Sequence, residues 1–183
     1  MKLIGYRQFI VFLWLLTATT LGYTGVFYSK QEALELAFGK TAKVEVLSLF
    51  PDDSQVAQIQ ERAKVKLESG LFSFYVGKEG DKVLGYAAIE TETVRTKPET
   101  LMVVLAPDGS LSQVVILAFH EPPEYQPPAR WFNQLLKKPI VELDFNKGVQ
   151  GISGATLSSR AAVSSVRKVL AIYEVMVQNK ATQ

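Results

Sequence analysis

The chain has 183 residues, no cysteine, one histidine and a formal net charge of +2. The lack of cysteine excludes disulfides, cysteine-ligated iron–sulfur clusters and thioether-linked haem, and a single histidine argues against a zinc site. Without Lys2 and Arg7 the chain carries 18 basic and 18 acidic residues, which does not indicate a nucleic-acid partner. Its length predicts one domain with a hydrophobic core and a terminal appendage.

Residues 1–29 are predicted to form a membrane anchor or a signal sequence. No charged residue occurs from 8 to 29, and this run is just long enough to span a bilayer as one helix. Lys2 and Arg7 precede it, so the positive-inside rule keeps the N-terminus in the cytoplasm. A cleaved signal peptide is the alternative, although Ala18-Thr19-Thr20 is a poor cleavage site. We expect a single-pass protein of the cytoplasmic membrane, with its C-terminal domain on the periplasmic or outer face.

Residues 30–69 are predicted to be a helix–strand–helix lead-in to the domain. Apolar residues on one side of 29–38, followed by Gly39, indicate a short helix. Alternation over 43–50 indicates a strand. Apolar residues at helical spacing indicate a surface helix from 54 to about 67.

A series of hairpins follows. Strands are expected at 72–76, 82–89, 101–105 and 111–119, with 90–99 as a loop or an extended edge. Lys78-Glu79-Gly80-Asp81 and Pro107-Asp108-Gly109 have the composition of tight turns. Successive hairpins predict an antiparallel sheet. The predicted fold class is therefore α+β, an antiparallel sheet packed by helices, with one N-terminal transmembrane helix.

The region between the last strand and the final helix carries several aromatic residues. Pro127-Pro128 predicts the start of a short helix with Trp131 on its apolar face. Trp131 could cover a flat ring, but core packing is the commoner role. Residues 140–145 are expected as a short strand or an extended segment.

The last segment, from 156 to 179, is a predicted amphipathic helix lying on the sheet. Its apolar stripe consists of Ala162, Val166, Val169, Leu170, Tyr173, Met176 and Val177. Its polar face consists of Arg160, Ser164, Arg167, Lys168, Glu174 and Gln178.

A run of small and hydroxylated residues leads into this helix. Gly151, Gly154 and Ala155 would let an anion approach the backbone, and the N–H groups of a helix start carry partial positive charge. The hydroxyls come from Ser153, Thr156, Ser158 and Ser159. An ordinary loop with a serine or threonine cap is the alternative.

Ser153-Gly154-Ala155-Thr156, followed by Leu157-Ser158-Ser159, resembles the flavinylation motif of the FMN-binding domain family. This family includes the flavin-carrying subunits of the sodium-pumping NADH:quinone oxidoreductase and of Rnf-type complexes. Its last motif Thr holds FMN through a phosphoester, so the resemblance implies that Thr156 is the attachment point. The cofactor-binding residues it implies beside Thr156 are Ser153, Gly154, Ala155, Leu157 and Ser158. Where the family has Asp three residues before the Ser, this chain has Gln150, a departure that concerns recognition by the modifying enzyme.

The loop after the strand at 111–119 carries a second, partial resemblance. His120, Glu121 and Pro123 match, by position, a family loop that lies against the flavin. The resemblance thus adds His120 and Glu121 to the candidate site. The alternatives are a solvated histidine at a strand end and an ordinary surface carboxylate.

The resemblance implies that residues 70–183 are an FMN-binding domain and that the chain is a membrane-anchored electron-transfer protein carrying FMN. The partners it implies are subunits of a membrane redox complex, the lipid bilayer, and an exported flavin transferase that uses FAD and Mg²⁺. No base stands beside Thr156 in the sequence, which argues against self-modification. The alternatives are a flavin-dependent enzyme or sensor, and a structural subunit that has lost its flavin.

Overall fold

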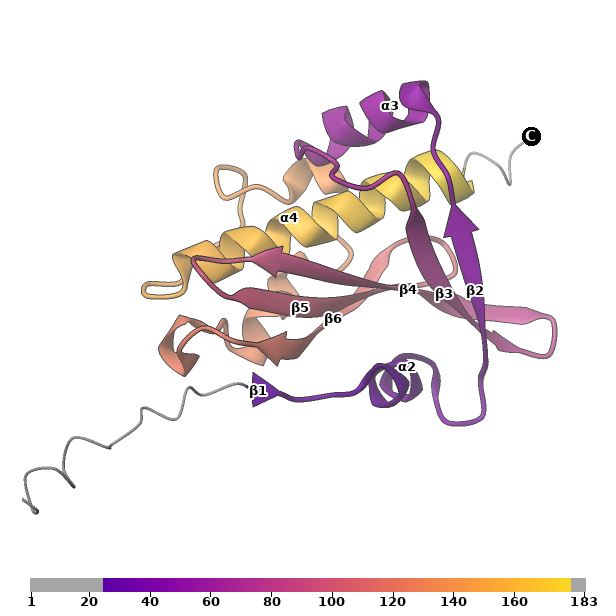
Figure 1. Ribbon diagram of the computed structural model, residues 1–183, viewed down its shortest axis with the longest axis horizontal. Helices are drawn as coiled ribbons and strands as arrows, with labels where there is room; N and C mark the ends of the chain where they lie inside the picture. The colour runs from indigo at the N-terminus through magenta and orange to yellow at the C-terminus, as the bar shows by residue number, and fades with distance from the viewer. Residues whose placement is uncertain (1–24, 179–183) are drawn as a thin grey trace, which may run out of the picture.

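The fold is built on one antiparallel sheet of six strands in the order β1-β6-β5-β4-β3-β2 (Figure 1). The computed structural model describes residues 25–178 of the chain. The strands are β1 Gly25–Val26, β2 Lys43–Leu49, β3 Phe72–Glu79, β4 Lys82–Thr93, β5 Pro98–Leu105 and β6 Leu111–Phe119. The predicted membrane segment lies almost wholly outside the described residues. Within them, no helix has both the length and the apolar character needed to cross a bilayer.

The hairpins predicted from the sequence are present, and β6 has the predicted bounds. Of the two alternatives for 90–99, the extended one describes most of the region, because β4 continues to Thr93 and β5 already begins at Pro98. Glu90 and Glu92 lie on the face of β4 that packs against the final helix of the chain. Both form ion pairs with Lys168 of that helix, at 2.6 and 2.7 Å. These ion pairs with a residue far along the chain offset the cost of placing two carboxylates on a strand beneath a helix.

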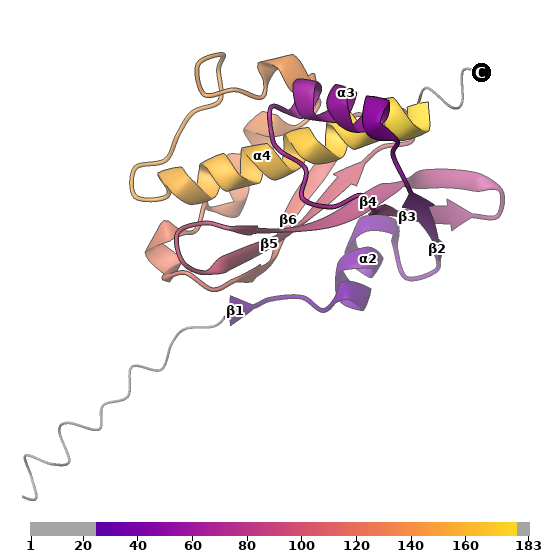
Figure 2. The ribbon, with the colours of Figure 1, turned by 45° about the horizontal axis from the view of Figure 1, so that its top comes forward.

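The main core lies between the sheet and α4 Thr156–Tyr173, which ends in a π-helical turn, η4 Glu174–Gln178 (Figure 1). The predicted apolar stripe of this helix is confirmed. Its buried members are Ala162, Val166, Val169, Leu170, Tyr173 and Met176. Helix α3, Asp53–Ala63, packs against α4 (Figure 2). It ends before the predicted residue 67 because Lys64 takes a left-handed conformation, with φ 54°.

Arg167 corrects the prediction for the polar face of this helix, because its side chain is buried. The guanidinium donates hydrogen bonds to the carbonyl oxygens of Arg62 and Ala63, at 3.0 and 2.8 Å, and of Leu143, at 3.0 Å. Two of these carbonyls belong to the last turn of α3, so Arg167 closes that helix end. Sequence patterns place arginine on the surface unless such partners are known.

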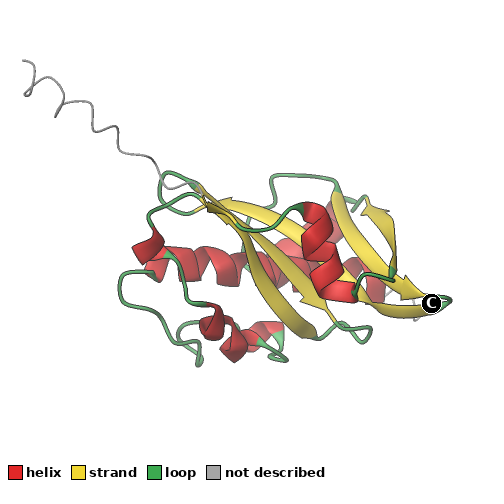
Figure 3. Cartoon of the chain, turned by 90° about the horizontal axis from the view of Figure 1, so that it is seen from below, coloured by secondary structure: helices red, strands yellow, loops and turns green. Residues whose placement is uncertain are grey.

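The opposite face of the sheet carries α2, Lys30–Phe38 (Figure 3, seen from that side). Ser29 and Glu32 form a capping box at its start, and Gly39 follows its last residue, as the sequence predicts. A smaller core fills this interface. It consists of Ala33, Leu34, Ala87, Met102, Val104 and Leu117.

Three 3₁₀ segments connect β6 to α4: η1 Pro123–Tyr125, η2 Ala129–Leu135 and η3 Ile140–Glu142. The helix predicted after Pro128 is present as η2. The short strand or extended segment expected at 140–145 is wrong, since its first residues form η3. Ile140 and Leu143 are both buried in the main core, and a spacing of three residues suits a 3₁₀ turn rather than a strand.

Candidate functional site

Thr156 is the first residue of α4, and the helix begins without a side-chain cap. Its N-cap residue is Ala155, whose carbonyl accepts from the N–H and the hydroxyl of Ser159, at 2.9 and 2.7 Å. The N–H groups of an uncapped first turn point out of the helix without an intrahelical acceptor. The start of α4 therefore presents backbone donors and the positive end of the helix dipole.

Gly154 allows the turn that leads into the helix. Its φ of +87° is a conformation that L side chains rarely adopt. A Cβ at this position would lie 3.8 Å from the carbonyl oxygen of Glu124, in η1. The motif and the loop after β6 are thus brought together through Gly154 and Glu124, although 30 residues of sequence separate them.

The side chains of the motif divide into exposed and buried ones. Ser153, Thr156 and Leu157 are exposed, whereas Ala155 and Ser158 are buried. The Thr156 hydroxyl donates to the carbonyl of Ile152 at 3.1 Å. The Ser158 hydroxyl, with 1% of the residue exposed, has no hydrogen-bond partner among the described residues. A buried hydroxyl without a partner costs about 1–3 kcal/mol, so a ligand that hydrogen-bonds to it would recover that energy.

A cavity of about 210 Å³ opens beside the start of α4. It is lined by Arg95, Tyr125, Gly154, Thr156, Leu157 and Ser158. The Arg95 guanidinium lies over the Tyr125 ring, 4.7 Å from its centroid, a distance typical of a cation–π contact. A cation, a helix N-terminus and an unpartnered hydroxyl in one cavity suit a phosphate group. Arg95 and Tyr125 were not predicted, because neither lies in a sequence motif.

Glu121 is buried beside this cavity but does not line it. One carboxylate oxygen accepts from the Thr96 N–H at 2.7 Å, the Lys97 N–H at 2.9 Å and the Thr96 hydroxyl at 3.3 Å. The hydrogen bond from the Thr96 main chain is the largest cause that holds the pKa of Glu121 below its usual value. Glu121 therefore fixes the turn between β4 and β5, which carries Arg95.

His120 is half-buried at the end of β6 and also lies outside the cavity lining. Its main-chain N–H donates to the carbonyl of Pro98 at 3.1 Å, which joins the ends of β6 and β5. The predicted flavin contacts of His120 and Glu121 remain predictions. The residue of this loop that reaches the cavity is Tyr125.

Trp131 and Gln134 hold the chain just before the motif. The Trp131 indole donates to the Gln150 carbonyl at 2.7 Å, and the Gln134 side chain accepts from the Gln150 N–H at 2.8 Å. Trp131 is buried and packs edge-to-face on Phe132, so the core role considered for it is the observed one. The Gln150 side chain, at the position where the family has Asp, is exposed.

Arg160 does not reach the cavity. Its guanidinium lies 5.2 Å from the ring centroid of Phe145, and Arg160 is not among the residues that line the cavity. The positive side chain at the site is therefore Arg95, from the β4–β5 turn.

Comparison with known proteins agrees with the motif. Residues 96–171 match the family model described as the FMN-binding domain. The matched span contains Tyr125, Thr156 and Ser158, and Arg95 lies one residue before it. No curated protein matches the chain.

Proposed function

Residues 96–171 belong to the FMN-binding domain family, and from this premise we propose that the chain is a membrane-anchored electron-transfer protein. FMN is the cofactor of this domain. The proposal adds that FMN is held covalently by a phosphoester to Thr156. It also places the domain on the outer face of the cytoplasmic membrane, tethered by the N-terminal segment.

The observation that carries the proposal is the exposed Thr156 hydroxyl at the first residue of an uncapped helix. The chain's residues fit the phosphate of FMN: Arg95 supplies positive charge, and the unpartnered Ser158 hydroxyl supplies a donor. The cavity of about 210 Å³ is smaller than a usual small-molecule site of roughly 300–1,000 Å³. It therefore suits the phosphate end of FMN, with the flavin ring beyond it.

A separate enzyme is needed to make the bond, because no base contacts the Thr156 hydroxyl among the described residues. Its hydrogen-bond partner is the Ile152 carbonyl, which does not take up a proton at neutral pH. The proposed donor is FAD, brought by an exported flavin transferase with Mg²⁺. The Thr156 oxygen would bond to the phosphorus of the FMN half as the pyrophosphate bond breaks, and AMP leaves with the hydroxyl proton.

FMN, when bound, supplies the electron-accepting and electron-donating chemistry. The chain would bind its phosphate at α4 and keep the cofactor attached where a lost flavin could not easily be replaced. The proposed partners are subunits of a membrane redox complex, which would deliver and receive the electrons.

Intact-mass measurement on the full chain co-expressed with a flavin transferase tests the covalent bond. We expect an increase equal to FMN minus one water, which Thr156→Val abolishes because valine has the shape of threonine without its hydroxyl. Thr156→Ser, which keeps a hydroxyl, is the matched control and should retain the adduct in part. An unchanged adduct on Thr156→Val would place the attachment elsewhere.

The same samples separate the alternative functions. Yellow protein without a mass adduct would indicate FMN held by noncovalent contacts, as in a flavin-dependent enzyme or sensor. Colourless protein without an adduct would indicate a structural subunit that has lost its flavin, and would overturn the electron-carrier proposal.

A further inference from the structure

The outer edge of β6 is open along its middle. At one end of this stretch the Leu111 carbonyl accepts from the Lys137 N–H at 3.0 Å. At the other end the Leu117 carbonyl accepts from the N–H groups of Phe27 and Tyr28, at 2.8 and 3.3 Å. Between them, no strand among residues 25–178 pairs with the side of β6 that faces away from β5.

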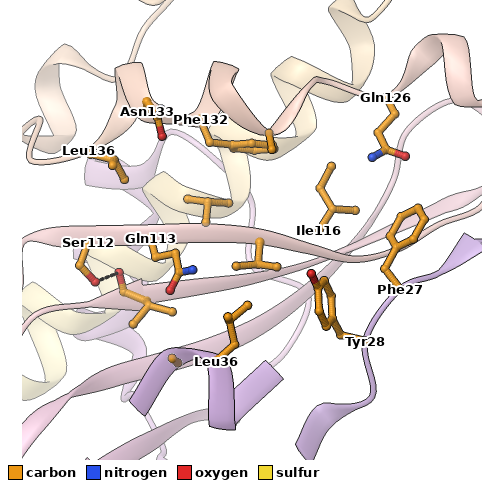
Figure 4. A pocket seen from close by; sticks show the side chains of 15 residues that line it. Phe27, Tyr28, Leu36, Ser112, Gln113, Ile116, Gln126, Phe132, Asn133 and Leu136 are labelled. Atoms are coloured by element: carbon orange, nitrogen blue, oxygen red, sulfur yellow. Dashed lines mark hydrogen bonds between the residues drawn. The ribbon is translucent and has the colours of Figure 1, made fainter. Parts of the chain in front are cut away.

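A groove of about 790 Å³ runs along this open edge (Figure 4). Residues from both faces of the sheet line it: Val115 belongs to the α2 side, and Val114 and Ile116 belong to the α4 side. A cavity lined from both faces of a strand must extend around the edge of that strand. The edge itself is therefore the floor of the groove.

Two walls rise beside the edge, one over each face. Leu36 of α2 forms one wall, and Phe132 of η2 together with Leu136 forms the other. These walls would hinder a second sheet from approaching the edge, whereas a single added strand would lie between them.

The chemistry of the groove selects its occupant. In an antiparallel edge strand every second residue directs its N–H and C=O outward, and such groups need hydrogen-bond partners when covered. The polar side chains that line the groove include the neutral amides of Gln113, Gln126 and Asn133, and none of the lining residues in the described part of the chain is charged. The occupant must therefore offer backbone amides and uncharged side chains, as an extended peptide does.

We propose that the β6 edge binds an extended, uncharged peptide segment of a partner protein, which joins the sheet antiparallel to β6. The pairing of β1 with Ala118 and Phe119 is already antiparallel on this edge, and the added strand would continue its line. This inference does not depend on FMN, since the groove shares no lining residue with the cavity at Thr156.

The test uses the full chain in lipid nanodiscs and a defined peptide probe. The probe carries the sequence of residues 100–105, which pairs with β6 on its other side, and is acetylated, amidated and flanked by lysines for solubility. Its matched control has N-methyl groups on alternate residues, which removes backbone donors but keeps every side chain. Fluorescence anisotropy measures binding, and hydrogen–deuterium exchange locates it.

Two protein variants complete the design. Leu36 and Leu71 are equally exposed, at 49%, but only Leu36 lines the groove. Leu36→Asp places a charge in an apolar wall and should weaken probe binding by at least about tenfold, or ~1.4 kcal/mol. Leu71→Asp should leave the affinity unchanged.

The expected result is slower exchange confined to residues 112–117, produced by the probe and not by its N-methylated form. Absence of this protection would overturn the proposal. Equal protection by the N-methylated peptide would also overturn it, because the groove would then recognise apolar surface rather than a strand. Self-association that protects the same residues without the probe would make a second copy the occupant.

Discussion

The two ends of α4 differ sharply in how well their polar groups are satisfied. At the C-terminal end, the Tyr173 ring packs edge-to-face on Phe74 and Tyr86, with centroid distances of 6.1 and 5.0 Å. Its hydroxyl donates to the Pro107 carbonyl at 3.3 Å, and burial raises the pKa of Tyr173 to about 12. At the N-terminal end, the helix is uncapped and Thr156 is exposed.

Buried polar atoms without partners gather toward the N-terminal end and middle of α4. Among residues 25–178 they are both side-chain oxygens of Glu99 and the hydroxyls of Ser158 and Ser165. Glu99 lies on the α4 face of β5, opposite Glu92 on the neighbouring strand. The difference teaches that tight packing at one end of a helix can keep polar groups at its other end without hydrogen-bond partners, so that a ligand can bind them.

Four predictions test this comparison.

The largest expected effect is on the pH dependence of stability through Glu99. Burial raises its pKa from 4.5 to about 8, so between these values the native state keeps a proton that the unfolded chain releases. The unfolding free energy should therefore fall as pH rises through this window, by about 1.4 kcal/mol per pH unit. Glu99→Gln, which is neutral throughout, should remove that slope in urea titrations. If the unfolding free energies of the unmodified chain and of Glu99→Gln changed in parallel with pH, Glu99 would not be a buried neutral carboxyl.

The second prediction concerns the packing of Tyr173 at the C-terminal end of α4. Gly109 has φ +86°, and a Cβ there would lie 2.2 Å from Cε1 of Tyr173. Gly109→Ala should lower the unfolding free energy by about 2–4 kcal/mol through backbone strain and overpacking. Gly80→Ala is the control, because Gly80 has φ +58° but no heavy atom near its Cβ position. An equal loss of unfolding free energy in both variants would mean that the Tyr173 ring moves aside at little cost. FMN content per folded molecule should not change in either.

The third prediction compares two serines of one helix. Ser158 and Ser165 are each 1% exposed with an unpartnered hydroxyl, but only Ser158 lines the cavity at Thr156. Without FMN, Ser158→Ala and Ser165→Ala should each leave stability unchanged or raise it by about 1 kcal/mol. Ser158→Ala alone should weaken FMN binding, measured by fluorescence titration of the Thr156→Val background. Equal affinities would remove Ser158 from the site.

The smallest expected effect concerns Glu121. Because its pKa is lowered, its stabilisation is present above the usual carboxyl pKa and is lost as pH falls through the folded value. Glu121→Gln should reduce this acid-side loss and loosen the turn that carries Arg95, with a modest fall in FMN affinity. The control is Asp144→Asn, since Asp144 also has a lowered pKa but lies outside the cavity lining. A change in FMN affinity with Asp144→Asn would show that the effect is not local.

Local patterns were sufficient for much of the fold and for the centre of the site. Strand 111–119, the short helix that ends at Gly39 and the apolar stripe of α4 depend on short-range patterns, and all are confirmed. Arg167 and the two-residue β1 depend on contacts between distant segments, which periodicity does not encode. The contact between Arg95 and Tyr125 also joins distant segments, and Glu121 holds the turn that carries Arg95 against the end of β6.

The hydrogen bonds that hold the main chain of Gln150 have a consequence for which side chains position 150 can carry. Trp131 and Gln134 form hydrogen bonds with the main-chain atoms of residue 150, and its side chain is exposed to solvent. Aspartate could replace glutamine there without shifting the peptide that leads to Thr156. Position 150 therefore combines a variable, exposed side chain with a fixed main chain. A substitution there would change what the proposed flavin transferase contacts without moving Thr156.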